Sequence, residues 1–342
     1  MLARISGIDV EHNHVPALRQ LLKTAGADQR ATVHLQFALH HELHALGDYA
    51  GAWRALEAGC RIQRQFQPYD LVDTARLFRG IRELCDRDFV QGKDFVAPLQ
   101  PIFIIGMHRS GTTLLERMLG GHPDVADAGE TYAFPAQLKL ASDHFFGGAI
   151  DQTVLERATH LDFEGIGRGF VDAMGFRASA RPFVTEKFNP NFIVAGLVAK
   201  ALPHSRFLHL RRDPVATCFS NLRTLFTLEA AYSYDQCELA DFFAMYHQLM
   251  SHWHDVMPGR ILDVDYSGLV ADPQAHAVVV AAHCGLVYRS EMLDVARPGG
   301  MVSTASAQHV RGGILGGRDE AWKHYEAKLE PLLDGLARHG LH

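Results

Sequence analysis

The first ninety residues alternate apolar and polar positions with the spacing of amphipathic helices. Apolar residues recur every three or four positions across residues 15–26, 28–46 and 49–66. This is the period of a helix that buries one face. The second and third helices are joined by the turn GDY and predict a helical pair. We therefore expect a small all-helical N-terminal region over residues 1–94.

The pattern changes after residue 95, where short apolar runs alternate with helical ones. Such alternation predicts an α/β domain over residues 95–342, a P-loop-like, three-layer fold whose mostly parallel sheet is covered on both faces. The chain has 342 residues, 47% of them hydrophobic, which suits one large domain or two. A helix is expected to begin at residue 112 and to be stopped by Gly120, Gly121 and Pro123. A second helix is expected at residues 191–202, and strands at 101–106, 183–187, 206–212 and 260–266.

The first predicted strand runs into the sequence GMHRSGTT and then into a helix. Glycines permit a tight backbone path, and the start of the helix attracts an anion. A nucleoside-triphosphate loop would carry lysine at position 112, where this chain has threonine, so Arg109 supplies the positive charge. A solvated strand-to-helix turn is the alternative. The residues expected to bind an anion are Gly106, Arg109, Ser110, Gly111, Thr112 and Thr113.

A second basic motif, LRRDPVATCFSN, follows about a hundred residues later. Arg212 stands at a predicted strand end and Ser220 lies eight residues on, within the following helix. A guanidinium and a hydroxyl placed this way could hold a further phosphate. Alternatively, Asp213 before Pro214 simply starts the helix with Arg212 as its partner.

Charge and cysteine content narrow the classes of function. The net charge is −6 with histidines neutral, whereas proteins that bind nucleic acid through bulk electrostatics are usually basic. The five cysteines are scattered, which disfavours a disulfide framework or a structural zinc site. No paired acidic motif suits Mg²⁺, and we predict no metal site. No apolar run is long enough to span a bilayer, and we expect a cytoplasmic protein.

The two phosphate motifs together resemble those of the sulfotransferases. The stretch PIFIIGMHRSGTTLLERML followed by LRRDPVATCFSN is closest to bacterial sulfotransferases with tetratricopeptide-like N-termini and to tyrosylprotein sulfotransferases. The resemblance covers roughly residues 95–335. It implies the donor 3′-phosphoadenosine 5′-phosphosulfate, the product adenosine 3′,5′-bisphosphate and no metal. The first loop would hold the 5′-phosphosulfate, and Arg212 with Ser220 the 3′-phosphate.

Two later stretches agree with the resemblance. ILDVDYSGLVADP is similar to a family segment whose tyrosine lies near the adenine, which would be Tyr266; ordinary packing is the alternative. VRGGILGGRDEAWKHYEA resembles the C-terminal loop that closes over the 3′-phosphate. There Arg311 is the matching cation and Trp322 the matching anchor. A flexible surface loop is the other interpretation.

The resemblance also implies two catalytic residues. Glu130, in DVADAGET, matches the family's catalytic glutamate and would act as the general base; a helix-capping carboxylate is the alternative. His108 and His122 are further candidates for the base. Lys187, in VTEKFNPNF, is similar to a lysine that faces the leaving-group or sulfuryl oxygens. A solvated lysine at a strand end is its alternative.

The helical leader contains one further resemblance. ALGDYAGAWRALEAG resembles part of a tetratricopeptide repeat, but we find about one such unit, whereas stacked repeats usually need three or more. A helical cap on the main domain is favoured. Peptide binding, or a homo-oligomer formed through this region, is the alternative.

We therefore predict an enzyme that transfers a sulfuryl group to a hydroxyl acceptor by in-line attack. A P-loop-like kinase or nucleotidase and a peptide-binding scaffold with a degenerate transferase domain are the alternatives. The acceptor could be a small molecule, a sugar or a peptide. Residues 132–182 and 223–245, to which we assign no element, are expected to face it. Neither a nucleic-acid partner nor a membrane span is expected.

Overall fold

The computed structural model describes residues 8–341 apart from 27, 94, 96, 227–228 and 298–317. The described residues divide into two compact units. The helical unit takes in residues 1–71, 213–244 and 317–342, and the sheet unit residues 72–212 and 245–316. The domain boundary expected between residues 94 and 95 stays a prediction.

The helical unit begins with three helices where the hydrophobic spacing predicts them. They are α1 (Val15–Thr24), α2 (Gln29–Ala45) and α3 (Tyr49–Phe66). Asp28 and Asp48 cap α2 and α3 by accepting hydrogen bonds from the backbone of each first turn. Gly59 lets α3 approach α2 closely, since a β-carbon at this position would lie 2.9 Å from the ring of Phe37. The N-terminal helical region is therefore confirmed.

Later segments complete the helical unit. They are α10 (Pro214–Leu222), η4 (Ala231–Tyr234), the first part of α11 (Gln236–Val256), η6 (Arg318–Lys328) and α15 (Glu330–Arg338). The η6 segment packs on the N-terminal helices. The Tyr325 hydroxyl lies 2.8 Å from His44 Nδ1, and the His324 ring stacks on Tyr49. Residues far apart in sequence therefore share one core.

The sheet unit contains five parallel strands in the order β2-β3-β1-β4-β5. The predicted strands 101–106, 183–187, 206–212 and 260–266 correspond within one residue to β1 (Gln100–Ile105), β3 (Phe183–Glu186), β4 (Arg206–Arg211) and β5 (Ile261–Asp265). The structure adds a short edge strand, β2 (Val125–Asp127). The expected α/β fold with a mostly parallel sheet is confirmed.

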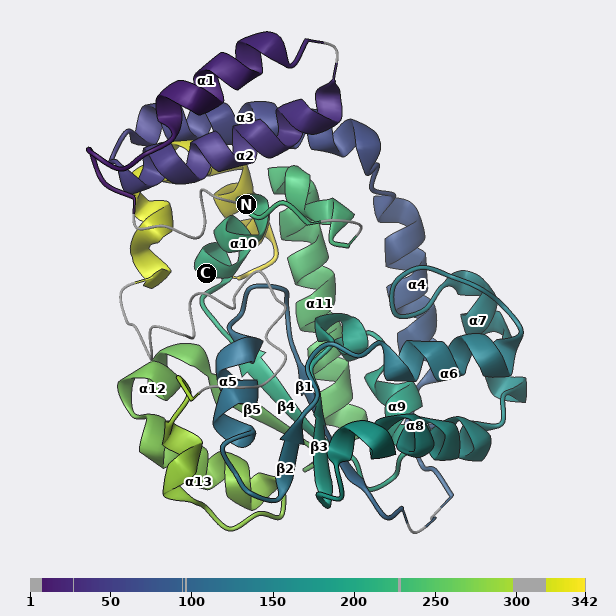
Figure 1. Cartoon of the computed structure of the whole chain (residues 1–342). Helices are drawn as coiled ribbons and strands as arrows, with labels where there is room; N and C mark the ends of the chain where they lie inside the picture. The colour runs from purple at the N-terminus through teal and green to yellow at the C-terminus, as the bar shows by residue number, and fades with distance from the viewer. Residues whose placement is uncertain are drawn as a thin grey trace. The chain divides into compact units, whose positions relative to one another are not determined.

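Helices cover both faces of this sheet (Figure 1). On one face, Ile104 and Leu208 pack with α5 (Thr112–Leu119), α12 (Tyr266–Ala271), α13 (Pro273–His283) and η5 (Ser290–Leu293). On the other face, Phe103 and Phe207 stack with each other, and Phe103 contacts Phe170 of α8 (Phe163–Ala178). Alternate residues of a strand thus enter different layers.

Further helices flank the sheet within this unit. They are α4 (Leu71–Leu84, all but its first residue), α6 (Ala133–Ser142), α7 (Gln152–Arg157), η2 (Ala158–His160), η3 (Asn189–Phe192), α9 (Ala195–Ala201) and the second part of α11. Trp253 of α11 is fully buried and donates a hydrogen bond to the Phe192 carbonyl at 2.7 Å. None of the helices in the described part of the chain is both long and apolar enough to cross a membrane.

Candidate functional site

Five of the predicted site positions lie at one edge of the sheet. Gly106, Lys187, Arg212 and Tyr266 directly follow β1, β3, β4 and β5, and Glu130 comes three residues after β2. Because all five strands are parallel, their carboxyl ends meet at the same edge. Ligands of open α/β sheets bind at that edge. The fold therefore gathers side chains from five separate stretches of sequence.

The loop between β1 and α5 has the strained backbone of a specialised turn. Gly106 and Gly111 adopt φ angles of 148° and 107°, and Arg109 adopts 68°. A β-carbon at Gly106 would lie 2.9 Å from the Leu210 carbonyl oxygen, so no larger residue fits there. A left-handed non-glycine residue costs about 1–3 kcal/mol, and such residues concentrate at functional sites.

Two hydroxyls of this loop differ in their contacts. Ser110 is 2% exposed, and its Oγ has no hydrogen-bond partner among the described residues. An unpaired buried hydroxyl is costly, and a bound anion would satisfy it. The Thr112 hydroxyl instead donates to Asn189 Oδ1 at 3.1 Å, while Asn189 Nδ2 donates to the Met107 carbonyl at 2.9 Å. Asn189, the first residue of η3, thus hydrogen bonds near both ends of the loop.

Arg212 and Tyr266 close the other side of the loop. Arg212 Nη1 donates to the Arg109 carbonyl at 2.9 Å, and its guanidinium lies 5.0 Å from the centre of the Tyr266 ring. A β-carbon at Gly111 would lie only 2.6 Å from two carbons of that ring. The structure therefore brings Arg212, Tyr266 and the loop into direct contact, as a cation–π pair packed on a glycine.

Glu130 and Lys187 form an ion pair at the same edge. Lys187 Nζ lies 2.5 Å from Glu130 Oε1. The lysine side chain is 1% exposed, whereas that of Glu130 is 37% exposed. A buried ammonium needs a counter-charge, and Glu130 provides it from the solvent side. A partly exposed carboxylate beside a buried cation has the access that a general base needs.

Two buried carboxylates, Glu116 and Glu186, hydrogen bond to residues next to this pair. Glu116 of α5 accepts hydrogen bonds from the Gly129 backbone at 2.9 Å and from the Thr185 hydroxyl at 3.2 Å. Glu186, the last residue of β3, accepts a hydrogen bond from the Thr131 hydroxyl. Burial raises the pKa of both carboxyls, that of Glu186 to about 8. The neighbours of Glu130 and Lys187 are thereby fixed in place.

The histidines offered as alternative bases differ in their surroundings. His122 is buried, its Nδ1 accepts from the Asp124 backbone at 3.1 Å, and its Nε2 lies 3.0 Å from the Val287 carbonyl. Both ring nitrogens are therefore engaged, and neither is left to take a proton from a substrate. His108 lies in the loop and is half-buried.

The remaining predicted residues belong to the helical unit or lie outside the described residues. Ser220 is on α10 in the helical unit, where its carbonyl accepts a hydrogen bond from the Thr224 hydroxyl at 2.7 Å. Trp322 is half-buried in η6 of the same unit. Arg311 lies outside the described residues. The roles of Ser220, Arg311 and Trp322 stay predictions from the sequence motifs.

Three contributors to this edge escaped the sequence analysis: Glu116, Glu186 and Asn189. Glu116 belongs to an amphipathic helix, and Glu186 stands next to Lys187, so neither differs locally from a surface carboxylate. The one available signal was the charge of Glu186 inside a predicted strand, since buried acids are rare. Asn189 is followed by Pro190, which alone predicts a turn.

Comparison of the sequence with known proteins assigns the chain to a family. The family model described as "Sulfotransferase family" matches residues 101–290, which is more than half of the chain. An uncharacterized protein of Aquifex aeolicus is 26% identical over 332 residues, covering 94% of this chain and 44% of that protein. A protein-tyrosine sulfotransferase of Drosophila melanogaster is 28% identical over 178 residues, covering 51% of this chain and 35% of that enzyme.

A solved structure agrees at the level of the fold. The sulfotransferase domain from the curacin biosynthetic pathway superposes with a TM-score of 0.50 at 18% identity, covering 71% of this chain and 99% of that domain. This chain spans less than half the length of the two relatives above. The family match includes the loop between β1 and α5, the Glu130–Lys187 pair and Tyr266. The chain therefore belongs to the sulfotransferase family.

Proposed function

We propose that this protein transfers a sulfuryl group from 3′-phosphoadenosine 5′-phosphosulfate to a hydroxyl acceptor by in-line attack. The observation that carries this proposal is the ion pair of Lys187 and Glu130 at the same sheet edge as the loop between β1 and α5. We call this loop, residues 106–111, the phosphate loop. The pair combines a candidate base with a cation, which are the two groups that transfer to a hydroxyl requires.

The residues around the loop fit a phosphosulfate group. Ser110 offers a buried hydroxyl without a partner, and Gly106 and Gly111 leave room for an anion to approach the backbone. In the proposal, these residues with Arg109, Thr112 and Thr113 hold the 5′-phosphosulfate, and Tyr266 lies near the adenine. The assignment of Arg212, Ser220 and Arg311 to the 3′-phosphate rests on the sequence motifs. The bound donor would supply an activated sulfuryl group on a phosphate leaving group.

The chemistry on the protein side divides between two residues. Glu130 accepts the proton that the acceptor hydroxyl releases as its oxygen bonds to sulfur. Lys187 stabilises the negative charge that develops on the departing phosphate oxygen, and it is fixed beforehand by its burial. As in phosphoryl transfer, positioning and electrostatics account for most of the acceleration.

The acceptor is proposed only as a hydroxyl. The name of the Drosophila relative gives tyrosine as that enzyme's acceptor, and a phenol is therefore the first acceptor to try. A kinase or nucleotidase is disfavoured because Thr112 replaces the lysine that contacts β- and γ-phosphates. The helical region 1–94 and the transferase domain 95–342 are proposed as the domain division.

Ligand-induced stabilisation tests the proposal directly. Adenosine 3′,5′-bisphosphate, added without metal, should raise the melting temperature. Its stabilisation should amount to about 2.7 kcal/mol at a hundredfold excess over the dissociation constant. AMP, which lacks the 3′-phosphate, should have a much smaller effect at equal concentration. ATP with Mg²⁺ serves as the comparison for a kinase. Equal shifts from AMP and the bisphosphate, or a larger shift from ATP with Mg²⁺, would contradict the proposed donor.

A further inference from the structure

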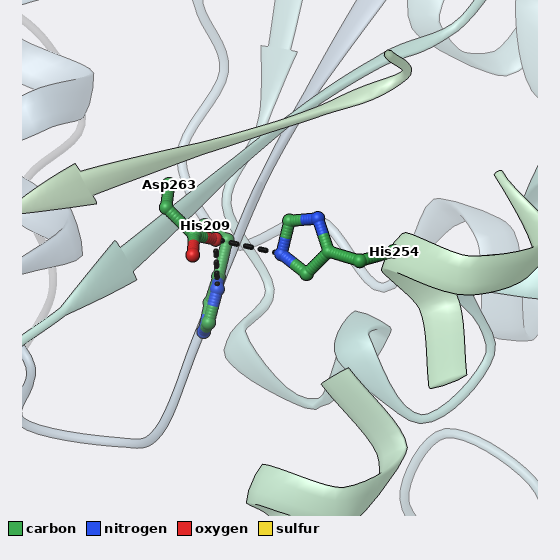
Figure 2. Close-up of side chains that lie close together, drawn as sticks. All are labelled: His209, His254 and Asp263. Atoms are coloured by element: carbon green, nitrogen blue, oxygen red, sulfur yellow. Dashed lines mark hydrogen bonds and ion pairs between the residues drawn. The ribbon is translucent and has the colours of Figure 1, made fainter. Parts of the chain in front are cut away.

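A second group of polar side chains lies away from the proposed reaction centre. His209 on β4 pairs in register with Asp263 on β5, and His254 reaches the same carboxylate from α11 (Figure 2). All three residues belong to the sheet unit. One candidate ligand atom from each residue lies within 4.8 Å of the others, and no other such group of His, Cys, Asp or Glu occurs among the described residues.

The distances between the candidate ligand atoms are slightly shorter than those around a small bound cation. Asp263 Oδ1 lies 2.7 Å from His209 Nδ1 and 2.9 Å from His254 Nε2, and Figure 2 shows both nitrogens directed at it. Tetrahedral zinc sites with bonds of about 2.0–2.1 Å separate their ligand atoms by roughly 3.3 Å. An opening of about half an ångström would therefore let an ion replace the two hydrogen bonds.

Outer contacts already orient the two inner ligands. The Tyr246 hydroxyl hydrogen bonds to His209 Nε2, the nitrogen that faces away from Asp263. Arg211 Nη1 donates to Asp263 Oδ2 at 3.2 Å, which leaves Oδ1 for the ion. Metal-binding histidines and carboxylates typically have such partners, which fix the ring and the carboxylate in place.

The group is open to solvent on one side. The side chains of His254 and Asp263 are 39% and 34% exposed, whereas that of His209 is 5% exposed. An ion can therefore enter, and a water molecule can take the fourth position.

We propose that His209 Nδ1, His254 Nε2 and one oxygen of Asp263 bind a divalent transition-metal ion of the zinc type, with water as the fourth ligand. Two imidazoles with one carboxylate suit zinc, cobalt, nickel or copper better than magnesium or calcium, which prefer oxygen ligands. Such an ion would tie β4, β5 and α11 together. The proposal departs from the expectation, drawn from the sequence, that the chain holds no metal, and it does not depend on the proposed function.

Cobalt binding is the first measurement. The full chain, without a histidine tag and freed of metal with a chelator, is titrated with Co²⁺ and then with Zn²⁺. One Co²⁺ per chain should bind with the visible absorption of a four-coordinate site, and Zn²⁺ should displace it. The chain has 21 histidines, so weak surface binding is expected as background. A titration without a single saturable site would overturn the proposal.

Variants assign the binding to this group. His254→Gln should weaken Co²⁺ binding at least tenfold, since loss of even an outer contact typically costs 10–100-fold. Asp263→Asn, which keeps the size of the side chain, should do the same. His247→Gln is the matched control, because His247 is exposed on the same helix outside the group. Unchanged affinity in His254→Gln and Asp263→Asn, or equal loss in His247→Gln, would overturn the assignment. Thermal melting in metal-free buffer separates loss of the ligand from loss of the fold.

Discussion

The Glu130–Lys187 pair is the residue-scale feature on which the proposed chemistry depends. Lys187 is almost fully buried, and its charge is balanced by one partly exposed carboxylate at 2.5 Å. Because its side chain is 37% exposed, Glu130 is accessible to a substrate hydroxyl, whereas Lys187 is held in place by its burial. The pair is therefore suited to taking up a proton while the cation stays in place.

Replacing Glu130 with glutamine tests the base. Glu130→Gln keeps the size and a carbonyl oxygen for Lys187 but takes up no proton. It should stay folded, bind adenosine 3′,5′-bisphosphate about normally and lose at least roughly a hundredfold in turnover. Turnover can be measured in the reverse direction with p-nitrophenyl sulfate. Glu156→Gln, the same change at an exposed position of α7, should leave it unaltered. Near-normal turnover in Glu130→Gln would make His108 the next residue to change.

At the scale of elements, the phosphate loop is defined by what packs against it. β1 and α5 set its two ends, but Asn189 from η3, Arg212 after β4 and Tyr266 at the start of α12 fix its path. Each contact joins residues at least 77 positions apart in sequence. The loop is thus preorganised by three neighbouring elements, which lowers the cost of binding an anion.

A methyl group at Gly111 should disturb this arrangement. Gly111→Ala places a β-carbon 2.6 Å from the Tyr266 ring on a backbone with φ of 107°. We expect a loss of about 1–3 kcal/mol in the free energy of unfolding and markedly weaker bisphosphate binding. Gly259→Ala is the control: its φ is 77° but a β-carbon there meets nothing within 4 Å, so only the backbone cost of about 1 kcal/mol applies. Urea unfolding and thermal shift measure both. Equal effects of the two changes would show that contact with Tyr266 is unimportant.

At the scale of the whole molecule, buried acids couple stability to pH. The pKa of Glu186 is raised from 4.5 to about 8, mainly by burial and also by the nearby Glu116. Hydrogen bonds from Thr131 and Asn191 and the charge of Arg177 oppose the rise. The folded state therefore keeps a proton that the unfolded chain releases above pH 4.5. The stabilisation is fully present below that value and is lost as pH rises through 8.

Glu186→Gln should flatten this dependence. In the wild type, the free energy of unfolding should fall between pH 5 and pH 8 by up to a few kcal/mol from this group. The glutamine variant has no proton to lose and should show a smaller fall over the same range. Urea unfolding at pH 5, 6, 7 and 8 measures the two slopes, and other titrating groups cancel in the comparison. Parallel slopes would place the pH dependence in other groups.

The sequence by itself determined most of the helices and strands and the positions of the candidate site residues along the chain. Apolar spacing predicted α1, α2 and α3 and four of the five strands, because helix and strand periods are local properties. The loop after β1 was also predictable, since glycines, a cation and hydroxyls follow a strand directly. The resemblance singled out Glu130 and Lys187, whose side chains then proved to be paired in the structure.

Only the tertiary structure decided which distant residues meet. No element was assigned to residues 163–178, yet α8 forms there. A β-carbon at Gly167 would lie 2.1 Å from the Ala201 carbonyl oxygen, so close packing on α9 requires that glycine. Likewise, the hydrogen bond from Asn189 to the loop depends on the order of the strands. The contact of His254 with Asp263 depends on the placement of α11. These are long-range contacts, and no local period or propensity encodes them.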